Sequence, residues 1–254
     1  MLAIDLFCGG GGTCLGLQQA GFTVIGIDIK RHKNYPGIFV QADIHALPLI
    51  LKKADLIWAS PPCQAFSPSS ARWIGTIEYP NLIPITRELL QGHPYTVIEN
   101  VPQAPIRQDL VLWGPQFGLG PTDDRDGLWR KRAFELSFFA WQLPRPSMDR
   151  SGCYATIAGT MSCSSTYERR KAKGKQGSLS TAEGKEIMGY PKNFKITRRE
   201  LVESVPPAYA RYIGCEALAR MKEAGYKCKM WQERVEWAES LTEPPFLKGR
   251  PKKK

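Results

Sequence analysis

The chain has 254 residues, of which 43% are hydrophobic and 10% aromatic, a composition typical of a globular protein with a sizeable core. No apolar run reaches the ~18 residues of a membrane span, and no basic segment precedes the N-terminal apolar stretch. Seven cysteines without CxxC spacing and only three histidines argue against a disulfide framework and a zinc site. We therefore expect a cytoplasmic (intracellular) protein with free thiols, no metal and no membrane contact.

The net charge of +11 and the isoelectric point near 9.4 have two interpretations. Part of the excess lies in two basic runs, at residues 168–175 and 248–254. Basic segments favour a polyanionic partner, because each phosphate contact releases counterions. A charged surface also keeps a protein soluble, so the charge alone leaves both interpretations open.

Strand and helix patterns alternate over the first 140 residues. Residues 2–8 (LAIDLFC) predict a buried strand, and a helix over 13–20 follows, which Gly21 is well placed to end. Further strands are predicted over residues 23–29, 54–60, 95–101 and 132–139. Apolar, β-branched strands separated by helices predict an α/β fold, an open and mostly parallel sheet with both faces covered.

The amino-acid composition of the chain changes near residue 140. Residues 140–180 are rich in Ser, Gly, Arg and Lys, and helical patterns return at 180–190 and 207–223. We divide the chain into a catalytic and cofactor-binding domain (1–139), a small target-recognition lobe (140–180), C-terminal helices that return to the large domain (181–240) and a basic tail expected to be disordered (241–254).

Four consecutive glycines, Gly9 to Gly12, follow the first strand and open a helix. Such a turn allows close backbone approach of a ligand and offers helix N–H groups to an anion. The residues that follow fit neither a dinucleotide fingerprint nor a P-loop, so a nucleoside that carries a carboxylate is favoured over phosphates. Asp28, at the end of the second strand, could bind ribose hydroxyls, although a tight turn and a surface carboxylate would also explain both features.

A single cysteine follows two prolines in the stretch SPPCQAF, residues 60–66. Proline restricts its own backbone and that of the preceding residue, so Cys63 is expected on a rigid elbow. The carboxyl ends of parallel strands meet at one edge of a sheet, and Asp28, Cys63 and Glu99 should therefore share one crevice. A thiol that faces a carboxylate there is a candidate nucleophile–acid pair.

Four ordered segments extend this interpretation: DLFCGGGGTCLGLQQAGF at 5–22, PPCQ at 61–64, ENV at 99–101 and RKRAFEL at 130–136. Together they resemble the ordered motifs of the cytosine-5 DNA methyltransferases. The resemblance implies the Rossmann-like fold of S-adenosylmethionine-dependent methyltransferases with a small recognition lobe. It also implies a monomer that acts on double-stranded DNA, as in bacterial or phage restriction-modification.

The resemblance assigns catalytic roles. Cys63 would add as a thiolate to carbon 6 of a flipped-out cytosine, which makes carbon 5 nucleophilic toward the methyl group of S-adenosylmethionine. Glu99 would bind ring N3 and the exocyclic amine, while Arg130 and Arg132 would hold the base carbonyl. Arg132 is also expected to favour the thiolate of Cys63.

Binding residues follow from the same motifs. The expected cofactor contacts, with S-adenosylmethionine as the only cofactor, are Phe7, Gly9, Gly11, Gly12, Asp28, Asp43 and Pro61. The candidate nucleic-acid contacts are Gln64, Ser67, Tyr167, Arg169, Arg170 and Lys171. The last three lie in the basic run 168–175, for which a solvated loop is the alternative interpretation.

Two departures from the family pattern keep alternatives open. Glu186 stands where the family usually has arginine, and Cys215 where it has an asparagine near the cofactor. The first alternative is a tRNA cytosine-5 methyltransferase. The second is a catalytically silent DNA-binding regulator or partner subunit, although the intact Cys63, Glu99 and Arg132 argue against it.

Overall fold

A computed structural model describes residues 1–46, 51–67, 78–120, 127–147, 157 and 179–225. Seven described strands form one sheet in the order β3-β2-β1-β4-β5-β7-β6. The strands are β1 (Leu2–Leu6), β2 (Thr23–Asp28), β3 (Ile38–Gln41), β4 (Leu56–Ala59), β5 (Thr96–Asn100), β6 (Leu110–Leu112) and β7 (Arg132–Leu136). The helices are α1 (Gly12–Ala20), α3 (Ile83–Leu90), α5 (Thr181–Ile187), α6 (Arg198–Glu203) and α7 (Pro207–Glu223), with short 3-10 helices η1 (Ile44–Ala46) and η3 (Gly114–Phe117).

The sheet confirms the predicted open, mostly parallel architecture. Strands β1 to β5 pair in parallel, whereas β7 runs antiparallel to both β5 and β6. The strand predicted over 132–139 is therefore present, but it does not continue the parallel series. Strands β3 and β6 were not predicted, because four and three residues are too few to show a clear pattern.

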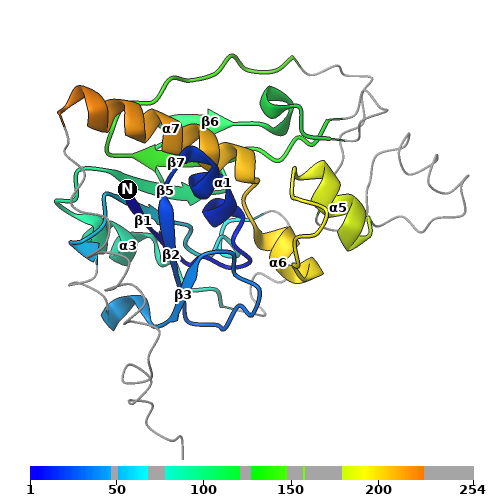
Figure 1. The fold of residues 1–254 in the computed structure, drawn as a ribbon, viewed down its shortest axis with the longest axis horizontal. Helices are drawn as coiled ribbons and strands as arrows, with labels where there is room; N and C mark the ends of the chain where they lie inside the picture. The colour runs from blue at the N-terminus through cyan, green and yellow to red at the C-terminus, as the bar shows by residue number, and fades with distance from the viewer. Residues whose placement is uncertain (47–50, 68–77, 121–126, 148–156, 158–178, 226–254) are drawn as a thin grey trace, which may run out of the picture.

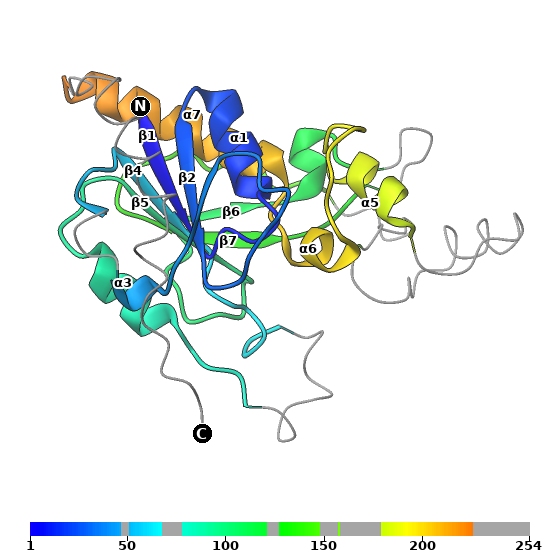
Figure 2. The same cartoon turned by 60° about the horizontal axis from the view of Figure 1, so that its bottom comes forward.

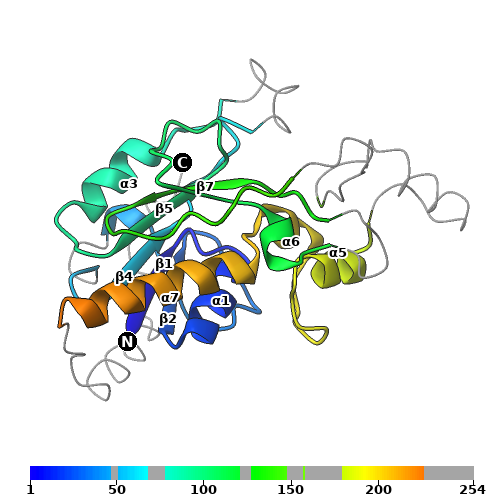
Figure 3. The same cartoon turned by 90° about the horizontal axis from the view of Figure 1, so that it is seen from above.

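Both faces of the sheet are covered, which explains the apolar strands (Figures 1 and 3). Helices α1 and α7 cover one face, where Trp58, Phe134 and Tyr209 form part of the core. Helix α3 covers the other face, and its Ile83 packs with Ile4 of β1. Because alternate side chains of a strand point to opposite faces, each central strand supplies both cores.

Helices α1 and α7 pack closely through glycine. A Cβ on Gly16 of α1 would lie 2.1 Å from the carbonyl oxygen of Pro207, and one on Gly214 of α7 would lie 2.9 Å from Cβ of Ala20. The helix predicted over 207–223 is confirmed with these bounds, and Gly21 ends α1 in the left-handed region at φ 105°. Helices α5 and α6 lie together at one end of the molecule (Figure 2).

Much of the predicted recognition lobe and the whole basic tail lie outside the described residues. This includes Tyr167, Arg169, Arg170 and Lys171. Within the ranges that the structure describes, no helix is both long enough and apolar enough to cross a membrane.

Candidate active site

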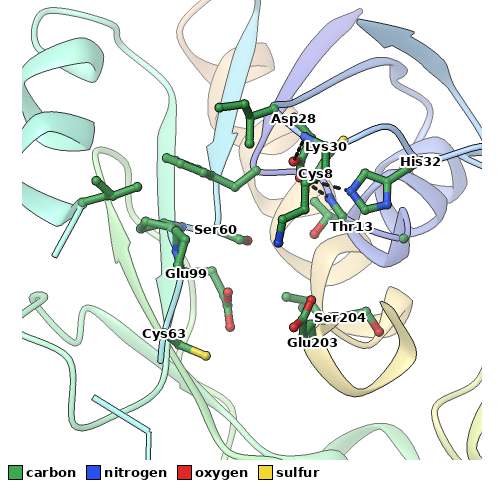
Figure 4. Close-up of a pocket in the computed structure, with 18 of the residues that line it drawn as sticks. Cys8, Thr13, Asp28, Lys30, His32, Ser60, Cys63, Glu99, Glu203 and Ser204 are labelled. Atoms are coloured by element: carbon green, nitrogen blue, oxygen red, sulfur yellow. Dashed lines mark hydrogen bonds and ion pairs between the residues drawn. The ribbon is translucent and has the colours of Figure 1, made fainter. Parts of the chain in front are cut away.

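A cavity of about 360 Å³ opens at the carboxyl ends of β1, β2 and β4, where Glu99 of β5 also reaches it (Figure 4). This is the edge at which the sequence predicted Asp28, Cys63 and Glu99 to meet, and all three line the cavity. The Cys63 sulfur and the Glu99 carboxylate point into the same space (Figure 4). The strand order therefore brings together residues from separate motifs, as expected for a parallel α/β sheet.

The turn between β1 and α1 forms one wall. Phe7 is the one non-glycine residue in the described part of the chain with a positive φ, 57°, and Gly9 follows at φ 48°. A Cβ on Gly9 would have no heavy atom within 4 Å, so open space lies beside this backbone. Gly12 and Thr13 begin α1 at the cavity, which places the positive end of the helix dipole there.

The other glycines of the turn serve packing. A Cβ on Gly10 would lie 2.8 Å from Cβ of Glu200 in α6, and one on Gly12 would lie 2.2 Å from the carbonyl oxygen of Val205. Gly11 does not line the cavity, since the position of its Cβ faces Pro36 at 2.3 Å. Gly10 and Gly12 therefore allow the C-terminal segment to lie directly on the turn, a function that was not predicted from the sequence.

Asp28 is fixed at the end of β2. Its carboxylate accepts hydrogen bonds from the backbone N–H groups of Gly9 (3.1 Å) and Lys30 (2.9 Å). Burial acts to raise the pKa of Asp28, but the His32 contact and the two backbone bonds outweigh it and lower the pKa below its usual value. Asp28 is therefore an ionised acceptor in the cavity wall, and Asp43 lines the same cavity.

Hydrogen bonds on both sides hold the elbow that carries Cys63. The side-chain amide of Asn100 donates to the carbonyl oxygen of Pro61 at 2.9 Å. The carbonyl oxygen of Cys63 accepts from the N–H groups of Phe66 (3.0 Å) and Ser67 (2.9 Å). The thiol is thus carried by a fixed backbone, as the two prolines suggested.

Glu99 and Arg132 form an ion pair beside this thiol. Nε of Arg132 lies 2.9 Å from Oε1 of Glu99, and the two side chains are 14% and 8% exposed. Ser60 donates a hydrogen bond to Glu99, and its own hydroxyl accepts from the indole N–H of Trp58 at 2.9 Å. Because β5 lies between β4 and β7 in the sheet, Glu99 is held by Ser60 from the β4 side and by Arg132 from the β7 side.

Burial dominates the protonation of both reactive groups. It raises the pKa of Glu99, with Arg132 opposing the effect. Burial and then the Glu99 charge raise the pKa of the Cys63 thiol, and the positive charges of Arg132 and Arg130 offset only part of this rise. Arg132 therefore acts in the direction expected from the sequence, but the thiol is protonated at neutral pH in this structure.

Arg130 has contacts other than those expected. Its guanidinium donates to the carbonyl oxygens of Val202 (2.7 Å) and Ser204, and it does not line the cavity. The hydroxyl of Tyr209 donates to the carbonyl oxygen of Arg130 at 2.9 Å. Burial lowers the pKa of Arg130 to about 9, which still leaves it cationic at neutral pH. Arg130 thus anchors the link between α6 and α7, instead of reaching the space beside Cys63.

The structure places most of the expected residues together. Those that line the cavity are Phe7, Gly9, Gly12, Asp28, Asp43, Pro61, Cys63, Gln64, Glu99 and Arg132. Gly11, Ser67 and Arg130 are described but do not line it.

The C-terminal wall of the cavity was not predicted from the sequence. Glu200, Glu203, Ser204 and Val205 line the cavity from α6 and the link to α7. Cys215, which stands where the family has asparagine, is exposed on α7 and does not line the cavity. Glu186 is likewise exposed and outside the cavity lining.

The charged residues that line the cavity limit which ligands it can bind. Its acidic lining residues are Asp28, Asp43, Glu99, Glu200 and Glu203, whereas the basic lining residues among those described are Lys30, His32, His45 and Arg132. This balance favours a ligand with positive charge over one with several phosphates.

Known proteins share the sequence motifs. A family model described as C-5 cytosine-specific DNA methylase matches residues 1–104. The Type II methyltransferase M.HindV of Haemophilus influenzae is 32% identical over 143 residues, which are 48% of this chain and 45% of that protein. The chain therefore aligns with less than half the length of this relative.

Solved structures share the fold over almost their whole length. A DNA modification methyltransferase encoded within an E. coli prophage has a TM-score of 0.54 and 16% identity, with 88% of this chain and 99% of that chain covered. Dnmt2 of S. pombe has a TM-score of 0.55 and 14% identity, with 87% and 99% covered. At these identities the likeness concerns the fold alone. The predicted resemblance to the cytosine-5 DNA methyltransferase family is confirmed over residues 1–104, which match its family model, and the chain shares the fold of these solved methyltransferases.

Proposed function

We propose that this protein transfers the methyl group of S-adenosylmethionine to carbon 5 of cytosine in double-stranded DNA. The observation that carries the proposal is that Cys63, Glu99 and Arg132 line one cavity with the glycine turn and Asp28. A thiol, a buried carboxyl and a guanidinium are the three groups that addition to a cytosine ring requires. The description of the matching family model, C-5 cytosine-specific DNA methylase, is consistent with a DNA substrate.

The residues present fit S-adenosylmethionine. Open space beside Gly9 accommodates a ligand against the backbone, and the N-terminus of α1 would hold the methionine carboxylate. Asp28 would accept from the ribose hydroxyls, and Asp43 from the adenine amine, with Phe7 and Pro61 beside the nucleoside. The acidic lining suits a sulfonium cation, which supplies an electrophilic methyl group when bound.

Cys63 acts as the nucleophile. Its thiol loses a proton, and the thiolate forms a bond to carbon 6 of the cytosine, which leaves carbon 5 as a nucleophilic enamine carbon. Methylation at carbon 5 is followed by loss of the carbon 5 proton to a base, and the electron pair released expels the Cys63 thiolate. The target base must leave the duplex stack to reach this cavity.

Glu99 and Arg132 stabilise the charge that this addition creates. The raised pKa of Glu99 helps its carboxyl to carry a proton and to donate it toward ring N3. Arg132 holds Glu99 and lies where it can bind the base carbonyl. Arg130, by contrast, positions the C-terminal wall through Val202 and Ser204.

The DNA-binding surface is part of the proposal. We assign contacts with the target to two residues beside the thiol, Gln64 and Ser67, and to four residues of the 140–180 lobe, Tyr167, Arg169, Arg170 and Lys171. Residues 181–240 would complete the catalytic domain 1–139. Phosphate contacts of this kind orient the duplex, while base contacts select the sequence. We propose that the protein works as a monomer.

One experiment tests the reaction and its nucleophile together. Purified wild type and Cys63→Ala are incubated with methyl-labelled S-adenosylmethionine and either duplex DNA or tRNA, and 5-methylcytosine is mapped. Label in DNA from the wild type alone supports the proposal. Label only in tRNA would indicate that the protein catalyses the same reaction on RNA and not on DNA. Cofactor binding without transfer to either would indicate a silent regulator or subunit and would contradict the proposed activity.

A further inference from the structure

His32 links two parts of the chain that are far apart in the sequence. It follows β2 and lines the cavity, and its side chain is 11% exposed. Its Nε2 lies 3.4 Å from Oδ2 of Asp28, and its Nδ1 lies 2.7 Å from Oε1 of Glu200 in α6. Figure 4 shows His32 next to Asp28 at the cavity wall. The sequence analysis assigned no role to either His32 or Glu200.

The two partners determine the charge of the ring. An ionised carboxylate only accepts hydrogen bonds, so each ring nitrogen of His32 must donate. A neutral imidazole has one N–H and can donate to only one of the two carboxylates, so contact with both favours the imidazolium. The contacts with Asp28 and Glu200 raise the pKa of His32 above 6.5 in spite of its burial.

Both partners are themselves fixed. The Oε2 atom of Glu200 accepts from the backbone N–H (2.8 Å) and hydroxyl (2.7 Å) of Thr197, the residue that caps α6. Asp28 accepts from Gly9 of the glycine turn. A continuous chain of hydrogen bonds thus runs from the turn through Asp28, His32 and Glu200 to the start of α6.

The position of α6 shapes the cavity. Its Glu200 lies against Gly10 so closely that a Cβ on this glycine would be 2.8 Å away. Glu203, Ser204 and Val205, at the end of α6 and just beyond it, line the cavity opposite Cys63. Without a cation between them, the Asp28 and Glu200 carboxylates would repel each other, and α6 would lose its attachment to β2.

We propose that His32, as an imidazolium, is a positioning residue that holds α6 against Asp28 and so completes the cofactor-binding end of the cavity. This inference rests on the proposed function, because it takes S-adenosylmethionine as the occupant. Loss of His32 weakens cofactor binding, and it leaves the methyl-transfer step at saturating cofactor largely unchanged.

Calorimetric binding of S-adenosylmethionine to the full chain tests this role. We expect His32→Gln and Glu200→Gln each to weaken binding by about tenfold, in line with loss of a hydrogen bond to a charged group. The double variant should be no more than about twofold weaker than either single variant, because both remove the same link. His93→Asn is the matched control: His93 bonds the carbonyl oxygens of Ala54 and Tyr95 outside the cavity, and its cofactor affinity should equal that of the wild type.

Kinetics and pH separate positioning from a general loss of structure. At saturating DNA, His32→Gln should raise the KM for S-adenosylmethionine about tenfold and change kcat by less than about twofold. The ionisable groups that face the ring are Asp28 from β2 and Glu200 from α6, whose pKa values are both lowered. Cofactor affinity of the wild type should therefore fall as pH rises through the pKa of His32, measured by NMR of its ring protons, and that of His32→Gln should not show this step.

The outcomes are distinguishable. If the wild type does not bind S-adenosylmethionine, the proposed function is contradicted. If the wild type binds it and folded His32→Gln binds equally well, only the role of His32 is overturned. Equal affinity of Glu200→Gln and wild type would also overturn it, since the link would then not pass through α6.

Discussion

Arg132 contacts Glu99 through its Nε at 2.9 Å, at a place where both side chains are largely excluded from solvent. Even so, the pKa of Glu99 is raised, because burial outweighs the attraction of Arg132 and the hydrogen bond from Ser60. A carboxyl whose folded-state pKa exceeds its unfolded value costs stability at every pH above both values, and this cost disappears on protonation. The buried, ionised Glu99 therefore lowers the free energy of unfolding of the protein.

Glu99→Gln should separate stability from activity. The amide resembles the protonated carboxyl, so at pH 8 the free energy of unfolding should equal or exceed that of the wild type. Methyl transfer should fall by at least ~100-fold, since the amide cannot supply a proton to the ring. Urea unfolding and a radiolabel assay check the two parts.

Arg132→Met should have the opposite effect on stability to Glu99→Gln. It leaves Glu99 buried without its counter-charge, and we expect the free energy of unfolding at pH 8 to fall by about 3 kcal/mol. The loss should shrink as pH falls toward the pKa of Glu99. A loss for Glu99→Gln as large as that for Arg132→Met would show that the pair is net stabilising and would contradict this interpretation.

The same variants should shift the ionisation of Cys63 in opposite directions. The Glu99 charge raises the pKa of the thiol and the Arg132 charge lowers it. Alkylation of Cys63 by iodoacetamide, followed by peptide mass spectrometry, should accelerate with pH in the wild type. The midpoint should be lower in Glu99→Gln and higher in Arg132→Met. Midpoints that move together would show that the charges do not reach the thiol.

The sequence was sufficient to predict the elements with strong patterns. Apolar, β-branched runs predicted β1, β2, β4, β5 and β7, and the long amphipathic pattern predicted α7. It could not reveal that β7 runs antiparallel, since the direction of a strand depends on its connection and not on its own residues. The six residues of α6 were also missed, because a helix of this length shows less than two full turns of periodicity.

The candidate site was predictable where residues end neighbouring strands. Asp28, Cys63 and Glu99 meet because parallel strands share a carboxyl edge. The sequence could not distinguish Arg130 from Arg132, two residues apart, of which only the second lines the cavity. Nor could it pair His32 with Glu200, since their contact depends on tertiary packing across 168 positions.

Close packing of α1 on the C-terminal segment predicts an unusual effect of alanine. In an exposed helix, Gly→Ala stabilises by about 1 kcal/mol. Gly16→Ala should instead lower the free energy of unfolding by at least ~2 kcal/mol, because its Cβ would lie 2.1 Å from the carbonyl oxygen of Pro207. Gln19→Ala, an exposed position in the same helix, should change it by less than about 0.5 kcal/mol. A Gly16→Ala protein as stable as the wild type would show that α7 can move away from α1 at little cost.

Arg130 offers the sharpest comparison between the expectation from sequence and the observed contacts. If it holds the link before α7 through the carbonyl oxygens of Val202 and Ser204, Arg130→Met should weaken S-adenosylmethionine binding by about tenfold, through displacement of the Glu203–Val205 wall. Its kcat at saturating cofactor should change less than its KM for the cofactor. Lys131→Gln, which removes the neighbouring positive charge from above the Trp113 ring outside the cavity, should bind the cofactor as the wild type does. The opposite pattern, unchanged cofactor affinity with kcat reduced by ~100-fold, would mean that Arg130 leaves these carbonyls during the reaction and contacts the cytosine, as its place in the RKRAFEL motif first suggested.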